Sequence, residues 1–213
     1  MKKLIVMAVI VLMFNGLTQA SVIAKYEFGD YPSYTLDPSI QGEHIIASDF
    51  GYFGDGTTDF ADHSENGGAY QAYGGWPDDE YTADYFHFTI TIEPGWSLDL
   101  DKQSIWFDAS IGSMTGPWSA KVTYLGSSEI PIGNEFEIGG GWYTYKTYQS
   151  VPSAGLTGEV EFRIYGNDAT SGGSFSIDNV ILNGSINQIP EPATMCLLGL
   201  GALSLLRRNR RFR

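Results

Sequence analysis

Strict alternation of apolar and polar residues constrains this chain more than any other feature of its sequence. The clearest run is residues 86–92, where Phe and Ile alternate with His and Thr. A period of two places one set of side chains on a single face of a β-strand. The same period recurs in segments 105–111, 118–124 and 160–164, with glycine-rich turns between them, and residues 21–189 show no helical period. The chain is therefore predicted to be all-β, and many short strands favour a two-sheet sandwich.

The first and last strands of this region are predicted to differ in regularity. The first strand is expected to place four alternating residues in the core, namely Val22, Ala24, Tyr26 and Phe28. The last has apolar residues at 175 and 177 and then at 180 and 182, which is a change of parity. If all four face the core, one extra residue forms a β-bulge at Asp178–Asn179. The alternative is a central strand buried on both faces. Residues 48–82 are expected to be a long loop region with one or two strands.

Residues 1–20 have the pattern of a secretory signal peptide. A basic start precedes the apolar run Leu4–Phe14, and Thr-Gln-Ala at 18–20 gives the small-x-small pattern of a cleavage site. Cleavage is predicted between Ala20 and Ser21, with Ala24 as the second choice. The alternative is an uncleaved anchor helix, but the run of 11 residues is short against the ~20 that span a bilayer.

The C-terminal segment 190–213 has three parts in order. These are Pro190-Glu191-Pro192, a 14-residue apolar run from 193 to 206, and an end with five arginines. A helix of 14 residues is roughly 21 Å long, against a hydrocarbon core of about 30 Å. We therefore predict a short membrane helix that spans poorly, with its arginines on the cytoplasmic side. A permanent tail anchor and a helix packed on the domain are the alternatives.

This tail resembles the PEP-CTERM sorting domain, because the motif, the apolar run and the basic end occur in that order behind an N-terminal signal peptide. The resemblance implies a Gram-negative bacterium and two partners during export, signal peptidase and an exosortase that recognises Pro190, Glu191 and Pro192. It also implies a transient stay in the inner membrane and delivery to the cell surface or an extracellular polysaccharide matrix.

The stretch 162–184 resembles the closing strands of jelly-roll sandwiches, including carbohydrate-binding modules. The resemblance implies a jelly-roll-like domain over residues 21–189 and a structural calcium ion held by Glu27 and Asp178, with Asp30 in support. The alternative is a solvated Glu27 and an Asp178 that caps a turn. The segment Asp55–Asp59 is a weaker calcium candidate, because it lacks the EF-hand spacing.

Charge and cysteine content exclude some classes of function. Residues 21–189 hold 24 acidic and only five basic residues, so nucleic acid is excluded as a partner. The single cysteine, Cys196, lies in the tail, so the domain has neither a disulfide nor a thiol nucleophile.

Aromatic residues between 70 and 81 are the predicted glycan-binding residues, and they are Tyr70, Tyr73, Trp76 and Tyr81. Sugar faces stack on such rings, and neighbouring acids accept hydrogen bonds from hydroxyl groups. A second aromatic cluster lies in residues 142–148. The alternative is that many of these rings fill the core, since aromatic residues favour strands.

No catalytic residue is predicted. The histidines at 44, 63 and 87 lack metal-ligand spacing, no G-x-S-x-G motif occurs, and pairs among 24 acids arise by chance. The sequence therefore predicts a non-catalytic, exported protein with a structural or glycan-binding role, and extracellular polysaccharide as a partner. The alternative is a secreted polysaccharide-active hydrolase.

Overall fold

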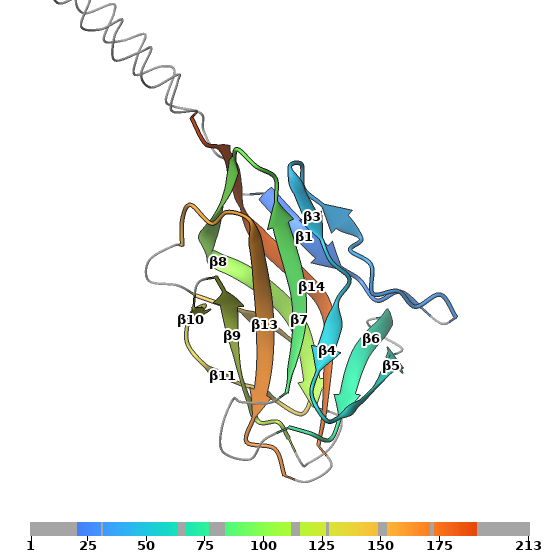
Figure 1. The fold of residues 1–213 in the computed structure, drawn as a ribbon. Coiled ribbons are helices and arrows are strands. Elements are labelled where there is room, and N and C mark those ends of the chain that lie inside the picture. Colours follow the sequence, from blue (N-terminus) through green and yellow to red (C-terminus); the bar gives the residue numbers. More distant parts are fainter. Residues whose placement is uncertain are drawn as a thin grey trace, which may run out of the picture.

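Two antiparallel β-sheets lie face to face and enclose the core (Figure 1). The computed structural model describes residues 21–30, 32–63, 67–76, 84–111, 116–126, 128–148, 153–170 and 173–190. Each sheet has seven strands within these ranges. The prediction of an all-β, two-sheet sandwich is confirmed.

The first sheet, called the β14 sheet, is built around the long strand β14. Its main path runs through β12 (Tyr143–Lys146), β8 (Trp96–Ile111), β14 (Ser174–Gln188), β1 (Ser21–Tyr26) and β2 (Ile40–Gln41). The hairpin of β5 (Thr57–His63) and β6 (Gly67–Tyr73) joins the same sheet where β6 pairs with β14.

The second sheet, called the β7 sheet, covers the other side of the core. Its main path runs through β10 (Glu129–Pro131), β9 (Ser119–Leu125), β13 (Glu159–Asn167), β7 (Tyr85–Ile92) and β3 (Ile45–Ala47). Two short strands complete it, β11 (Phe136–Glu137) beside β9 and β4 (Gly51–Phe53) beside β7.

The core contains the alternating apolar residues predicted for segments 86–92 and 160–164. Phe86, Phe88 and Ile90 of β7 are fully buried, as are Phe162 and Ile164 of β13. Phe88 and Phe162 lie directly opposite each other in the ladder, and their rings stack with centroids 5.1 Å apart. Burial of such rings is the main favourable contribution to folding in a domain without disulfides.

Strand β14 contains the predicted bulge. Phe175, Ile177, Val180 and Leu182 are all fully buried, so both parities face the core. Between the pairs Asp178–Asp108 and Ile181–Trp106, β14 advances three residues while β8 advances two. The extra residue is absorbed at Asn179, which has a positive φ of 49°. The bulge is therefore confirmed, and it keeps four apolar side chains in the core.

Polar groups at the bulge satisfy one another. The Asn179 amide nitrogen donates to Asp108 Oδ2 and to Asp178 Oδ2, both at 3.0 Å. The Asn179 backbone N–H donates to Asp178 Oδ1 at 2.7 Å. Asp108 also accepts a bond from the Thr144 hydroxyl of β12 at 2.6 Å. The side-chain amide of Asn179 thus links Asp178 of β14 to Asp108 of β8.

Three expectations need correction. Val22 was expected in the core but is 36% exposed, because a bulge between Val22 and Ala24 turns Ile23 inward instead. Trp118 precedes β9 and is 40% exposed, so the core positions of that strand begin at Ala120. The region 48–82, expected to be mainly loop, contains β4, β5 and β6.

The terminal segments of the chain fall outside the described residues. The predicted signal helix over residues 1–20 lies there, as does the predicted membrane helix behind Pro190. In the described part, no helix has the length and apolar character needed to cross a membrane.

We expect Asn179→Ala to lower the free energy of unfolding by about 1–3 kcal/mol, because it removes the amide bridge and leaves a Cβ in a left-handed conformation. Asn179→Gly is the matched control. It loses the same bridge but adopts a positive φ freely, so its loss should be smaller by about 1 kcal/mol. Urea unfolding followed by tryptophan fluorescence measures both. Equal losses would contradict a conformational constraint at this position.

Candidate functional site

The outer face of the β7 sheet carries the polar residues that alternate with the core residues. His87 of β7, Arg163 of β13 and Thr123 of β9 occupy facing positions in three adjacent strands. The next row toward the β3 end contains Thr89 and Glu161 in the same register. Since neighbouring strands lie about 4.8 Å apart, side chains in one row are within reach of one another.

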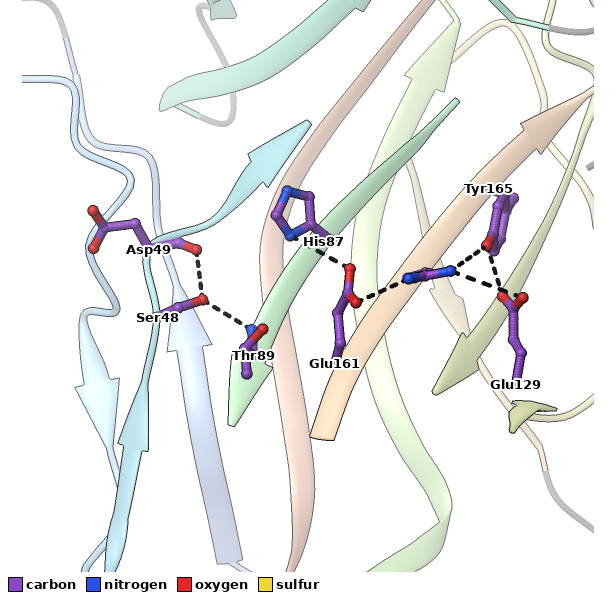
Figure 2. Close-up of polar contacts among 8 residues, drawn as sticks. Ser48, Asp49, His87, Thr89, Glu129, Glu161 and Tyr165 are labelled. Atoms are coloured by element: carbon purple, nitrogen blue, oxygen red, sulfur yellow. Dashed lines mark hydrogen bonds and ion pairs between the residues drawn. The ribbon is translucent and has the colours of Figure 1, made fainter. Parts of the chain in front are cut away.

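Five side chains on this face form a continuous charged network, made up of His87, Glu161, Arg163, Tyr165 and Glu129. His87 Nδ1 lies 3.8 Å from Glu161 Oε1. The Arg163 guanidinium donates to Glu161 Oε2 at 2.9 Å and to the Tyr165 hydroxyl at 3.3 Å. The Tyr165 hydroxyl donates to Glu129 Oε1 at 2.6 Å, and Figure 2 shows how the network crosses from β7 over β13 to β10.

Burial and these contacts set the charge of the network. Partial burial alone would raise the pKa of Glu129, but hydrogen bonds from Thr123 and Tyr165 and the charge of Arg163 lower it below its ordinary value. Burial lowers the pKa of His87 despite the nearby Glu161. Burial, with the hydrogen bond to Glu129, raises the pKa of Tyr165 to about 12. At neutral pH, Glu129 is therefore ionised, while His87 and Tyr165 are neutral.

An aromatic row runs beside the network on the same face. Phe53, Tyr85, Tyr165 and Lys121 occupy facing positions of β4, β7, β13 and β9. The Phe53 and Tyr85 rings stack with centroids 5.1 Å apart, and the Arg163 guanidinium lies 4.6 Å from the Tyr85 centroid. Phe53 is 58% exposed, whereas Tyr85 and Tyr165 are buried. The row therefore presents one exposed ring, that of Phe53, which packs against the buried ring of Tyr85.

Ser48 and Asp49 border this face next to β7. The Ser48 hydroxyl accepts a bond from the Thr89 N–H at 2.9 Å and donates to the Asp49 carbonyl at 2.8 Å, as Figure 2 shows. The Asp49 carboxyl is exposed, and its pKa is raised by a hydrogen bond with Asp37 and by the charge of that residue. The face thus combines an exposed ring, carboxylates, a cation and hydroxyl groups.

The predicted glycan-binding aromatics do not share one surface. Tyr70 and Trp76 are each 7% exposed, and they pack with Phe86 in the core. Buried rings have no free face for a sugar, so Tyr70 and Trp76 are not available to stack on one. Tyr73 is 41% exposed on β6, where its hydroxyl donates to Gln71 at 2.8 Å. Tyr81 lies outside the described residues.

Two of the three predicted calcium ligands come close together. Asp178 is buried, and it accepts a hydrogen bond from the Phe28 backbone next to Glu27. Burial, opposed by these hydrogen bonds and reinforced by the charges of Asp108 and Glu27, raises the pKa of Asp178 to about 6. Glu27 is exposed and paired with Lys25, and Asp30 is exposed.

The oxygens of Asp178 are already engaged in hydrogen bonds. Calcium requires six to eight oxygen ligands. Both Asp178 oxygens already accept bonds from Asn179, whose amide nitrogen also donates to Asp108. In the described part of the chain, no group of three or more His, Cys, Asp or Glu side chains is arranged to hold a metal. The described side chains therefore do not complete a calcium site on their own, and the ion stays a prediction.

The weaker calcium candidate at Asp55–Asp59 is organised by a buried acid instead. Asp84 is 1% exposed and accepts hydrogen bonds from the Asp55 N–H at 3.0 Å and from the Tyr52 hydroxyl. Burial raises the pKa of Asp84. The carboxylate of Asp84 therefore holds the start of this segment in place.

Sequence reasoning missed the charged network for a specific reason. Its members come from β7, β10 and β13, which are separated by up to 78 positions between His87 and Tyr165. A local signal was present, because Glu161, Arg163 and Tyr165 are polar residues that alternate with the predicted core residues of one strand. Which residues face them from other strands depends on the sheet order, which alternation does not define.

Comparison with protein families gives one match, at the C-terminal end. Residues 188–211 match the family model of the PEP-CTERM protein-sorting motif. The range contains Pro190, Glu191 and Pro192, so the resemblance is confirmed. The motif implies export, processing by an exosortase and sorting to the cell surface. No curated protein matches the chain.

Comparison with solved structures finds carbohydrate-binding modules of similar fold. A variant of the family 29 module CBM29-2, complexed with mannohexaose, is 14% identical with a TM-score of 0.42, over 78% of this chain and 92% of that one. The xylan-binding domain CBM22-1 of Paenibacillus barcinonensis Xyn10C is 9% identical with a TM-score of 0.47, over 83% and 99%. A CBM4 structure is 10% identical with a TM-score of 0.40, over 63% and 86%.

We expect Asp178→Asn to change the pH dependence of stability. The folded pKa of about 6 lies above the unfolded value of about 3.9, so the wild-type carboxyl stabilises the fold most below pH 4 and loses this contribution as pH rises to 6. The stability of the variant relative to wild type should therefore increase from pH 4 to pH 6 and then level off.

Thermal unfolding at half-unit pH steps measures this difference. Asp59→Asn, which changes an exposed carboxyl on β5 of the same sheet, is the matched control. A constant difference between Asp178→Asn and wild type across pH 4–7 would contradict the raised pKa.

Proposed function

We propose that this chain is an exported, non-catalytic protein that binds polysaccharide through the outer face of the β7 sheet. The observation that supports the proposal is the exposed Phe53 ring, fixed by Tyr85 beside the charged network. The PEP-CTERM motif supplies the export half of the proposal. We expect delivery to the surface or the polysaccharide matrix of a Gram-negative cell.

The geometry suits a sugar chain for chemical reasons. An aromatic ring packs against the apolar C–H face of a pyranose, while hydroxyl groups need donors and acceptors at the edge of the ring. Glu129, Glu161 and Arg163 offer charged acceptors and a donor within one network. Because these groups already hold one another in place, little side-chain freedom is lost on binding.

The charge of the domain favours a neutral polysaccharide over an acidic one. Residues 21–189 hold 24 acidic residues against five basic ones, and the chain as a whole has a formal net charge of −13. Arg163, the cation at the centre of the face, is already shared between Glu161 and Glu129. An anionic polymer would meet both general repulsion and a cation that is already paired.

The calcium ion also remains part of the proposal, and chelation tests it. An ion that binds only the folded state raises the melting temperature by mass action. A fall in melting temperature with EDTA, restored by added calcium, would establish the ion. An unchanged melting temperature would remove it.

We expect Phe53→Ala to weaken binding to a neutral polysaccharide by roughly 3- to 10-fold, because it removes the exposed ring that stacks on the sugar. Affinity electrophoresis of the purified protein in gels that contain mannan, xylan or a mixed-linkage glucan measures the change. Tyr148→Ala is the matched control, since Tyr148 is 59% exposed and Phe53 is 58% exposed.

Tyr148→Ala should retain the wild-type affinity. If the wild-type protein binds a polysaccharide and Phe53→Ala binds it equally well, the ligand does not use this face. If Tyr148→Ala alone loses binding, the site lies instead near the second aromatic cluster, in residues 142–148.

The alternative function is polysaccharide hydrolysis, and one observation keeps it open. A glycosidase needs a carboxylic acid of raised pKa beside a carboxylate. Asp49 has a raised pKa at the border of the face, and Glu161 lies on it. Glu129, in contrast, has a lowered pKa and is unsuited to act as the acid.

We expect the protein to bind polysaccharide without releasing reducing ends. Arg163 is paired with both glutamates of the network, so neither carboxylate is free to act on a glycosidic bond. A reducing-sugar assay over a day at pH 5 and pH 7 measures release. Release that disappears in both Asp49→Asn and Glu161→Gln would favour the hydrolase instead.

A further inference from the structure

Strand β14 runs into the sorting motif without a spacer. The strand ends at Gln188, which pairs with Trp96, and the match to the sorting motif begins at the same residue. The Ile189 N–H donates to the Gly95 carbonyl at 2.8 Å, so the next residue is also bonded to the sheet. Pro190 follows at once and is exposed (Figure 1 shows the chain leaving the end of β14).

The end of β14 is held by more than its last ladder bonds. The Asn187 amide donates to Asp99 Oδ2 at 2.9 Å, and Asn187 pairs with Ser97. Ile186 is partly buried and packs against the core. Separating the end of β14 from the sheet would break side-chain contacts as well as backbone hydrogen bonds. The folded sheet therefore extends up to the motif.

Chain geometry then limits how far the motif lies from the domain. Three residues span at most about 10 Å, so Pro190–Pro192 cannot lie further than that from Ile189. A folded enzyme is wider than this reach, since even a 100-residue domain has a radius of gyration of about 13 Å. It must therefore touch the surface that surrounds the exit of β14.

Two turns that contact each other make up that surface, one at His44 and one between Glu93 and Trp96. The His44 ring stacks on Trp96 with centroids 3.7 Å apart and an angle of 9°. His44 Nδ1 lies 3.0 Å from Glu93 Oε2, and the Glu93 N–H donates to the His44 carbonyl at 3.0 Å. The side chains of His44 and Glu93 are 36% and 52% exposed, and Ile189 is 41% exposed. We call this the exit surface.

We propose that the exit surface, formed by His44, Glu93, Trp96 and Ile189, is a docking surface for the exosortase outside the membrane. It extends recognition beyond the Pro-Glu-Pro residues to the folded domain. Glu93 and the exposed Glu43 make the rim acidic, which fits a basic or hydrogen-bond-donating surface on the enzyme. The inference is separate from polysaccharide binding, because the charged network lies on another part of the molecule.

The test measures processing of the full-length chain in cells that carry an exosortase, with pulse labelling and an antibody against the domain. We expect Glu93→Lys to slow conversion about fivefold, the effect of reversing one exposed contact charge. Glu137→Lys is the matched control, an exposed acid on β11, which pairs with Ser119 at the other end of the β7 sheet. Conversion of this control should match wild type.

A second chain carries six Gly and Ser residues between Ile189 and Pro190, which move the motif up to about 20 Å from the domain. In this chain Glu93→Lys should no longer have an effect, because the enzyme can engage the motif without touching the exit surface. Unchanged processing of Glu93→Lys in the native chain would overturn the proposal. So would an effect of Glu93→Lys that persists with the spacer, or a spacer chain that is processed faster than wild type, since the domain would then only obstruct the enzyme.

Discussion

The single extra residue in β14 is the constraint on which the rest of the structure depends. This strand pairs with β8, β1 and β6, so its register fixes most of its sheet. Without the bulge at Asn179, either Phe175 and Ile177 or Val180 and Leu182 would face away from the core. Burying both pairs favours the bulge by several kcal/mol, on the order of 2 kcal/mol per side chain, which exceeds the roughly 1–3 kcal/mol of a strained backbone residue. The amide of Asn179 then satisfies the acids that the bulge brings together.

The two faces of the β7 sheet differ in how much they contribute to stability. The inner face is apolar and supplies ring-on-ring contacts such as Phe88 on Phe162. The outer face gains little stability from its ion pairs, because partly exposed pairs contribute about 0–1 kcal/mol each. Glu129, Glu161 and Arg163 nevertheless hold one defined arrangement through shared hydrogen bonds. This arrangement contributes little to folding, and it is fixed in position beside the exposed Phe53 ring.

Alternation predicted the fold where strands are regular; at irregular positions it succeeded in β14 and failed in β1. It identified the core residues of β7 and β13, because a regular strand places every second residue on one face. It also located the bulge in β14, since four apolar residues made the parity change visible. It missed the bulge in β1, because Val22 and Ile23 are both apolar and either can occupy the core position. Sequence alone could not decide between them, and the pairing with β14 did.

The candidate site was harder to predict than the fold for a related reason. Tyr70 and Trp76 were predicted on the surface because residues 48–82 were expected to be mainly loop. Tyr70 instead lies on β6 and Trp76 follows that strand, and both rings pack against Phe86. A large ring contributes most when buried, so its local neighbours are a weak guide to its position. The polar residues of β13 were visible, but their partners on β7 and β10 follow from sheet order, which is a property of the whole domain. A candidate site on a sheet face is therefore assembled from residues of several strands, and only the order and register of the strands bring them together.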